Sequence, residues 1–166
     1  MYMRLKRRDI RRREGDRLLE ELRARFNLRI DLRVGRFEVA EFDDASIYIL
    51  DGRPLLFKVD NKLYPTLLFD EAINILPRIV VDQGAIPYVC RGADVMAPGI
   101  VRIDGTFHEG DLVAVCDEKY GKTIALGIAL RDSEAIESMD RGKAIKNIHY
   151  VGDKIWEVSK LIRASI

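Results

Sequence analysis

The residues best placed to do chemistry in this chain lie in one segment, and few of them are reactive groups. The segment reads DQGAIPYVCRGADVMAPGIVRID from Asp82 to Asp104. Three glycines and two prolines punctuate it, with no cluster of acids, bases or nucleophiles: Gly84, Gly92, Gly99, Pro87 and Pro98. Glycine lets the backbone turn through positive φ and lets another backbone approach closely. Such a composition suits a surface that receives a polymer, such as a nucleic acid strand, better than one that transforms a small molecule.

The rest of the sequence shows no recognised catalytic pattern. Two histidines and two cysteines, far apart in the chain, give none of the spacings typical of a zinc site. Neither the G-x-x-x-x-G-K-[ST] nor the G-x-G-x-x-G phosphate loop is present, and a G-x-S-x-G elbow is also missing. We therefore expect no enzyme activity, no catalytic residues, no metal and no cofactor.

The charge of the chain is nearly balanced overall but uneven along its length. The formal net charge is +1, yet residues 1–13 hold seven Lys or Arg against a single acid, Asp9. A basic N-terminal arm of this kind can engage phosphate, or it can be a solvated tail. The sequence leaves both interpretations open.

Several features predict a cytoplasmic protein without a membrane anchor. No apolar run approaches the length of a membrane span, and the basic start contains no Ser, unlike a transit peptide. Cys90 and Cys116 each lie in an apolar stretch, which is typical of free, buried thiols in a reducing compartment.

The elements that must position the glycine-rich segment fall into two groups. Apolar residues at helical spacing predict an amphipathic helix over 12–26, and a meander of strands over 36–42, 46–50, 55–59 and 62–64 follows it. A short helical segment over 65–76 ends at Pro77. Beyond it we expect short helices at 83–91 and 133–139. The strands expected there are 78–81, 95–103, 112–116, 123–130, 146–150 and 154–158, in a small β-barrel.

The glycine-rich segment resembles a known motif. Asp82-x-Gly84-Ala85 followed by Gly92-Ala93-x-x-Met96-x-Pro98-Gly99-Ile100 is similar to the core of the PUA domain, an RNA-binding module. Later parts of the pattern follow in order: Gly110-Asp111-x-Val113, Ala125-x-Gly127 and Gly142-Lys143-Ala144-Ile145. A narrower resemblance, to the malignant T-cell-amplified sequence and ligatin branch, is carried by Leu63-Tyr64-Pro65-Thr66-Leu67, Ile75-Leu76-Pro77, Val81-Asp82-Gln83-Gly84-Ala85-Ile86, and Asn147-Ile148-His149-Tyr150 with Trp156. The Arg-rich start and compact length resemble an archaeal member of that branch.

The resemblance implies an α+β protein of two domains. Residues 1–77 form a pre-PUA α/β domain, a helix on a small antiparallel sheet, with the basic arm at its start. Residues 78–160 form the PUA pseudobarrel with short helices, and 161–166 form a C-terminal tail.

The resemblance also implies an RNA-binding groove between the helix after Asp82 and the strand after Gly92, flanked by the last strand. The residues we expect to bind RNA are Gly84, Arg91, Gly92, Ala93, Asp94, Arg102, Lys143, Lys146, His149 and Lys154. The arginines and lysines would pair with phosphates, and His149 would stack on a base or form a partly buried pair with Tyr150. Met96 is expected in the core, and Lys119 and Lys122 in a solvated hairpin tip.

For the family, the resemblance implies a non-catalytic translation factor that engages tRNA or the small ribosomal subunit in initiation, reinitiation or recycling. A partner protein bound through the pre-PUA domain is a further expectation. Two alternatives fit the same residues: a detached RNA-targeting subunit of a tRNA-modification enzyme, and a protein-interaction adaptor.

Overall fold

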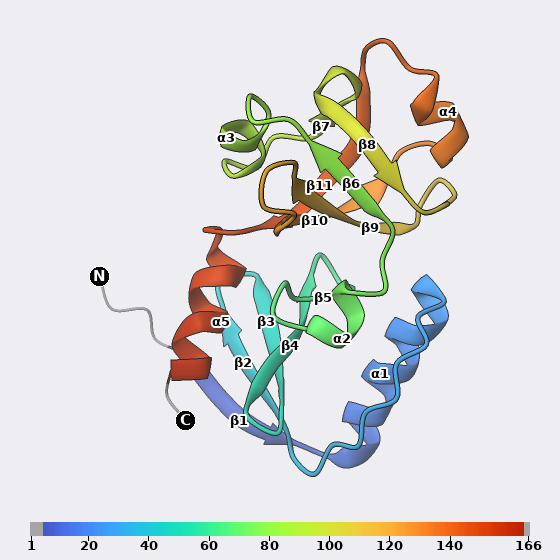
Figure 1. Cartoon of the computed structure of the whole chain (residues 1–166). Coiled ribbons are helices and arrows are strands. Elements are labelled where there is room, and N and C mark those ends of the chain that lie inside the picture. Colours follow the sequence, from blue (N-terminus) through green and yellow to red (C-terminus); the bar gives the residue numbers. More distant parts are fainter. Residues whose placement is uncertain (1–4, 165–166) are drawn as a thin grey trace. The chain divides into compact units, whose positions relative to one another are not determined.

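The computed structural model of the chain describes residues 5–164 and divides into two compact units (Figure 1). The first unit runs to Asn74 and resumes at Glu157, and the second unit is Ile75–Trp156. The last part of the chain therefore belongs with the N-terminal unit. Residues 161–164, which were predicted to lie in a tail, are part of the helix α5 (Lys154–Ala164).

The first unit is an antiparallel meander with helices, as the sequence predicted. Its strands lie in the order β1-β2-β3-β4-β5, and each is antiparallel to its neighbour. The elements are β1 (Lys6–Ile10), α1 (Arg12–Phe26), β2 (Phe37–Phe42), β3 (Ala45–Leu50), β4 (Arg53–Val59), β5 (Lys62–Pro65) and α2 (Asp70–Ile73).

Helix α1 forms over the predicted range because one face of it is apolar. Leu18, Leu19 and Leu22 on that face are buried. The helix passes so close to the sheet that a Cβ added at Gly15 would lie 2.3 Å from ring atoms of Phe37. The small residue at this position therefore allows the helix to approach β2.

Strand β1 was not predicted, and it corrects the expectation of a free basic arm. Residues 6–10 pair with β2 at the edge of the sheet. Arg7 Nε lies 2.8 Å from Glu38 Oε2 and Arg8 Nη2 lies 3.3 Å from Glu41 Oε1, so acids of β2 pair with two arginines of the arm. Asp9 of β1 pairs in turn with Arg36, at 2.7 Å. These ion pairs connect β1 to its neighbours in the sheet.

The second unit is a curled half-barrel with short helices, again as predicted. Its strands are ordered β7-β11-β10-β9-β6-β8, and β6 is parallel to β9. The elements are β6 (Arg78–Val81), α3 (Ile86–Val89), β7 (Val95–Met96), the 3₁₀ turn η1 (Ala97–Gly99), β8 (Ile100–Asp104), β9 (Leu112–Asp117), β10 (Thr123–Ala129), α4 (Ser133–Glu137) and β11 (Lys143–Tyr150). Branched and small apolar side chains fill its core, among them Ile79, Val113, Val115 and Ile145.

Three predicted elements of this unit were wrong in detail. The strand over 95–103 is broken by η1, because Pro98 has no N–H to contribute to a strand ladder. The helix over 83–91 shrinks to α3, and Pro87 lies in its first turn, where a missing N–H costs nothing. The strand over 154–158 is instead the start of α5, and Asp153 Oδ1 accepts a hydrogen bond from the Trp156 N–H at 2.8 Å.

Candidate nucleic-acid interface

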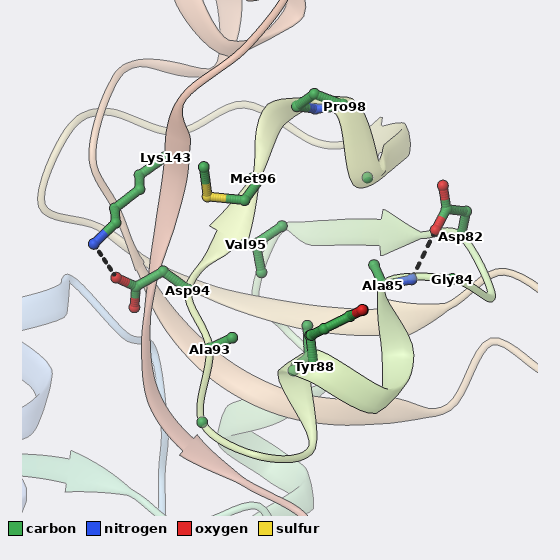
Figure 2. Close-up of a pocket in the computed structure, with 13 residues that line it drawn as sticks. Asp82, Gly84, Ala85, Tyr88, Ala93, Asp94, Val95, Met96, Pro98 and Lys143 are labelled. Atoms are coloured by element: carbon green, nitrogen blue, oxygen red, sulfur yellow. Dashed lines mark hydrogen bonds and ion pairs between the residues drawn. The ribbon is translucent and has the colours of Figure 1, made fainter.

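The glycine-rich segment supplies nearly all of the lining of an open groove in the second unit (Figure 2). The volume of the groove is about 740 Å³. The residues that line it come from the turn after β6, from α3, from the turn after α3, from β7 and from η1, with one contribution from β11: Asp82, Gly84, Ala85, Tyr88, Val89, Gly92, Ala93, Asp94, Val95, Met96, Pro98, Gly99 and Lys143.

Local backbone chemistry builds the first wall of this groove. Asp82 Oδ1 accepts the N–H of Ala85 at 2.9 Å, which fixes the turn that leads into α3 (Figure 2). Helix α3 ends after one turn, and the N–H of Ala93 reaches back to the carbonyl oxygen of Tyr88 at 3.0 Å. The chain therefore reverses direction directly after α3, and residues of both α3 and the following turn line the groove.

Gly92 has a structural reason to be glycine at that reversal. Its φ is +96°, a conformation that other residues adopt only at a cost in energy. A Cβ added there would also lie 3.1 Å from the ring of Tyr150. A substitution at Gly92 would therefore disturb the fold as well as the groove.

The opposite wall is attached to the last strand through Asp94. One carboxylate oxygen of Asp94 accepts the main-chain N–H of Asn147 at 2.9 Å, and the other lies 3.2 Å from Lys143 Nζ (Figure 2). The Lys143–Asp94 pair places a cation at the rim of the groove and also neutralises it.

The chemistry of the groove is apolar, with one exposed aromatic ring. The side chain of Tyr88 is 64% exposed and that of Met96 is 45% exposed, and both border the groove. A flat, uncharged group such as a nucleobase can pack on these two side chains. The one cation among the residues that line the groove, Lys143, is paired with Asp94.

The predicted RNA-binding residues divide into two sets in the structure. Gly84, Gly92, Ala93, Asp94 and Lys143 line the groove together. Of the remaining residues, Arg91 is exposed in the turn that follows α3, Lys146 is exposed on β11, and Lys154 begins α5.

Arg102 lies outside the groove and has a partner of its own. It is on β8, where its guanidinium contacts both carboxylate oxygens of Asp104, at 2.9 and 3.1 Å. This pairing raises the pKa of Arg102 and lowers the pKa of Asp104. Binding of a phosphate by Arg102 would have to compete with that carboxylate.

His149 does not fit the expected role of stacking on a base. Its side chain is 0% exposed, and Nδ1 lies 2.8 Å from Asp153 Oδ2. The ring is enclosed at the junction between β11 and α5, where Asp153 also caps the helix. This burial speaks against stacking on a base and agrees with the other expectation, a buried structural role, with Asp153 as a partner of the ring.

Two groove residues were missed or misjudged from the sequence. Tyr88 was not singled out, and Met96 was expected in the core. The available signal was Pro87, which fixes the start of α3 just before Tyr88, and Tyr88 lies on the exposed face of that single turn. Met96 belongs to a strand of only two residues at the edge of the sheet, and this could not be read from the sequence.

Within residues 5–164, no group of three or more His, Cys, Asp or Glu side chains is placed to hold a metal ion. Both cysteines are free, and burial raises the pKa of the Cys90 thiol. None of the helices in the described range has the length and apolar character needed to span a bilayer.

Each of the two units matches a known protein family. Residues 77–151 match the PUA domain, and residues 6–69 match a domain of unknown function, DUF1947. An uncharacterised protein of Methanocaldococcus jannaschii is 49% identical over 74% of this chain and 76% of its own length. Translation machinery-associated protein 20 of Saccharomyces cerevisiae is 31% identical over 70% of this chain and 68% of its own length. Malignant T-cell-amplified sequence 1 of Rattus norvegicus is 32% identical over 70% of this chain and 66% of its own length.

Solved structures share the whole fold. A PUA domain protein of Aeropyrum pernix, crystallised as a tartrate complex, has a TM-score of 0.83 at 31% identity, covering 96% of this chain and 94% of its own. A conserved PUA domain protein of Thermoplasma acidophilum has a TM-score of 0.73 at 32% identity, and the match covers 92% of this chain and 99% of its own.

The fold and the groove thus define a protein with a PUA-type RNA-binding domain. More particularly, the chain belongs to the PUA-domain proteins that carry an N-terminal DUF1947 (pre-PUA) domain, related to malignant T-cell-amplified sequence 1, translation machinery-associated protein 20 and archaeal PUA proteins.

Proposed function

We propose that this protein is a non-catalytic RNA-binding factor of the translation machinery, with tRNA or the small ribosomal subunit as its partner in initiation, reinitiation or recycling. The observation that carries this proposal is the groove itself. Its walls are main chain and small apolar side chains, with Tyr88 exposed on one side and Met96 on another. Nothing in that lining is a candidate nucleophile held by a base.

RNA suits this groove better than a small metabolite does. Its lining bears two carboxylates, Asp82 and Asp94, and one cation, Lys143, so anion binding is weak inside it. An unpaired nucleotide can place its base on Tyr88 while its phosphates remain on the rim. Recognition of RNA through stacking on aromatic side chains follows the same logic in other single-strand binders.

The names of the relatives support the connection with translation. Translation machinery-associated protein 20 is 31% identical to this chain over 124 residues, which is 70% of the chain. The step of translation and the tRNA or ribosomal partner come from the family resemblance, and the groove supports the binding of RNA.

A matched pair of substitutions tests the role of the groove. Ala93 lines the groove and Ala135 is exposed on α4, outside it, so Ala93→Glu and Ala135→Glu add the same bulk and charge at two sites. Sedimentation of cell extracts on ribosome gradients, followed by crosslinking to RNA, measures association for each variant. We expect Ala93→Glu to lose small subunits and crosslinked tRNA or rRNA, and Ala135→Glu to retain them.

Three outcomes would contradict the proposal. If the wild-type protein is absent from small subunits and crosslinks to no tRNA or rRNA, it is not a translation factor of this kind. If Ala93→Glu folds and associates like the wild type, the groove is not the site. If cells that lack the protein have a changed tRNA modification profile, and the protein itself does not sediment with small subunits, the protein is instead the targeting subunit of a modifying enzyme.

A further inference from the structure

The hairpin between β9 and β10 carries a second group of residues with the chemistry of a nucleic-acid contact. The tip consists of residues 118–122, and Tyr120 at its centre is 70% exposed, a high value for a large aromatic residue. Lys119 Nζ lies 5.2 Å from the centroid of the Tyr120 ring. Lys122 is exposed, and Arg78 from β6 reaches the tip and donates to the carbonyl oxygen of Gly121 at 2.6 Å. The tip therefore combines one exposed ring with three cations, of which Lys119 lies over the ring.

The tip is held in a fixed conformation by a buried carboxylate. Asp117 is only 6% exposed, and its two oxygens accept the main-chain N–H groups of Tyr120 and Lys122. These hydrogen bonds, led by the one from Tyr120, lower the pKa of Asp117. Main-chain bonds between Asp117 and Gly121 and between Asp117 and Lys122, each 3.0 Å long, close the same loop. Since the turn is already ordered, presenting the ring to a ligand costs little entropy.

The tip begins beside the groove. Val81 pairs with Asp117 in the parallel ladder of β6 and β9, and the N–H of Glu118 donates to the carbonyl oxygen of Val81 at 3.1 Å. The next residue along, Asp82, lines the groove, and Glu118 Oε1 accepts the N–H of Gln83 at 3.2 Å. Neighbouring strands lie about 5 Å apart, so the base of the tip adjoins the rim of the groove.

The tip supplies what the groove lacks. The one cation of the groove, Lys143, is paired with Asp94, and Asp82 adds a further negative charge. At the tip, Arg78, Lys119 and Lys122 are accompanied by three carboxylates. Those of Glu118 and Asp117 accept hydrogen bonds from Gln83 and from the turn, and Asp104, which is opposite Arg78 in the ladder of β6 and β8, is held by Arg102. The exposed side chains of Lys119 and Lys122 can therefore contact phosphate, and the exposed ring can stack on a base.

We propose that the β9–β10 hairpin tip is a second RNA-binding site, in which an unpaired nucleotide of a strand that occupies the groove stacks on Tyr120 while its phosphates contact Lys122 and Lys119. This inference rests on the proposed function of the groove. It extends that function from one pocket to a track for single-stranded RNA.

Oligoribonucleotides of two lengths separate the two sites. A strand of about four nucleotides is meant to occupy the groove, and one of about twelve is long enough to reach the tip as well. Fluorescence anisotropy measures the affinity of the full-length protein for each. We expect wild-type protein to bind the longer strand more tightly and Tyr120→Ala to lose that gain, a loss of about 5- to 150-fold. Tyr120→Phe, which keeps a stacking ring, should retain it.

The lysines are tested by salt dependence. Lys119→Gln combined with Lys122→Gln should reduce the slope of log affinity against log salt by about 0.7 for each lost phosphate contact. Arg131→Gln is the control for loss of a cation elsewhere, because Arg131 is exposed beyond the opposite end of β10, a strand about 20 Å long. It should leave the slope unchanged.

Each alternative result has a separate meaning. If Tyr120→Ala binds both strands like the wild type while Ala93→Glu weakens both, the groove binds RNA but the tip does not, and this inference is wrong. If wild-type protein binds neither strand, the proposed function fails and the inference fails with it. If Tyr120→Ala loses ribosomes yet binds naked RNA normally, the tip contacts a protein and the assignment to RNA is overturned.

Discussion

The main-chain N–H of Asn147 donates to a carboxylate oxygen of Asp94 at 2.9 Å, so the last strand of the second unit holds a wall of the groove. The side chain of Asn147 strengthens this connection: its Nδ2 lies 3.0 Å from the carbonyl oxygens of both Val89 and Ala93. Asn147 itself does not line the groove. It positions the turn between α3 and β7, which does.

Removing the Asn147 side chain should make the turn between α3 and β7 less rigid. We expect Asn147→Ala to lower the free energy of unfolding by about 1–2 kcal/mol, because two carbonyl oxygens lose their donor. Affinity for RNA should fall as well, since the turn that carries Ala93 is no longer fixed. Urea unfolding and anisotropy with a short oligoribonucleotide measure the two effects.

The control for this change is Asn74→Ala, which removes an exposed amide outside the groove. It should alter neither quantity by a measurable amount. If Asn147→Ala is destabilised yet binds RNA like the wild type at a temperature where it is folded, the positioning role is wrong and the residue is purely structural.

Acid should weaken the first unit through Glu38. The hydrogen bond from Arg7, assisted by the charges of Arg7 and Arg36, lowers the pKa of Glu38 below its ordinary value of 4.5. Because the pKa in the folded state is lower than in the unfolded chain, the stability that this carboxylate provides is complete above about pH 4.5 and is lost as the pH falls through the folded pKa. The midpoint of urea unfolding of the wild type, followed from neutral pH into acid, should decline over that range.

Two glutamate variants identify the group that causes the decline. Glu38→Gln should be less stable at neutral pH by about 1 kcal/mol and less sensitive to acid. Glu41→Gln, which removes an exposed partner of Arg8, should keep the acid sensitivity. An unchanged acid profile in Glu38→Gln would assign the effect to another carboxylate.

Deleting residues 1–10 should destabilise the first unit rather than only remove charge. The deletion takes away β1, and with it the partners of Glu38 and of the edge of β2. Substituting Arg11→Gln and Arg13→Gln together removes exposed charge next to the strand while leaving β1 in place. We expect a lower unfolding midpoint for the deletion alone. Equal midpoints for all three proteins would show that β1 contributes nothing to stability.

The sequence was sufficient where the signal was local. Helix α1 forms over the predicted range because its apolar spacing is regular, and the Asp60-Asn61 turn between β4 and β5 has the positive φ values, 50° and 60°, that such a hairpin requires. The groove segment was also found, because glycine and proline mark backbone geometry directly.

The sequence was insufficient where the partners are distant. The arginines of β1 looked like a free arm, since Glu38 and Glu41, which pair with them, lie about thirty residues further along the chain. The role of His149 stayed open between stacking and burial, because nothing nearby in the sequence shows that the end of β11 is enclosed. In α5 the helical spacing of Ile155, Val158 and Ile162 was present, but a shorter window over 154–158 reads equally well as a strand.

Gly127 and Gly84 differ in the space around them, and this difference can be tested. A Cβ at Gly127 on β10 would lie 2.2 Å from a methyl group of Ile145 and 3.1 Å from the carbonyl oxygen of Lys146, whereas one at Gly84 meets nothing closer than 3.4 Å. Gly127→Ala should therefore lower the free energy of unfolding by about 1–3 kcal/mol, as overpacked cores do, and Gly84→Ala should be neutral or slightly stabilising. Urea unfolding of both variants checks the difference. Equal stabilities would mean that β11 shifts to admit the methyl group. Such a shift should alter the affinity for RNA, because β11 carries both Lys143, which lines the groove, and Asn147, which holds Asp94.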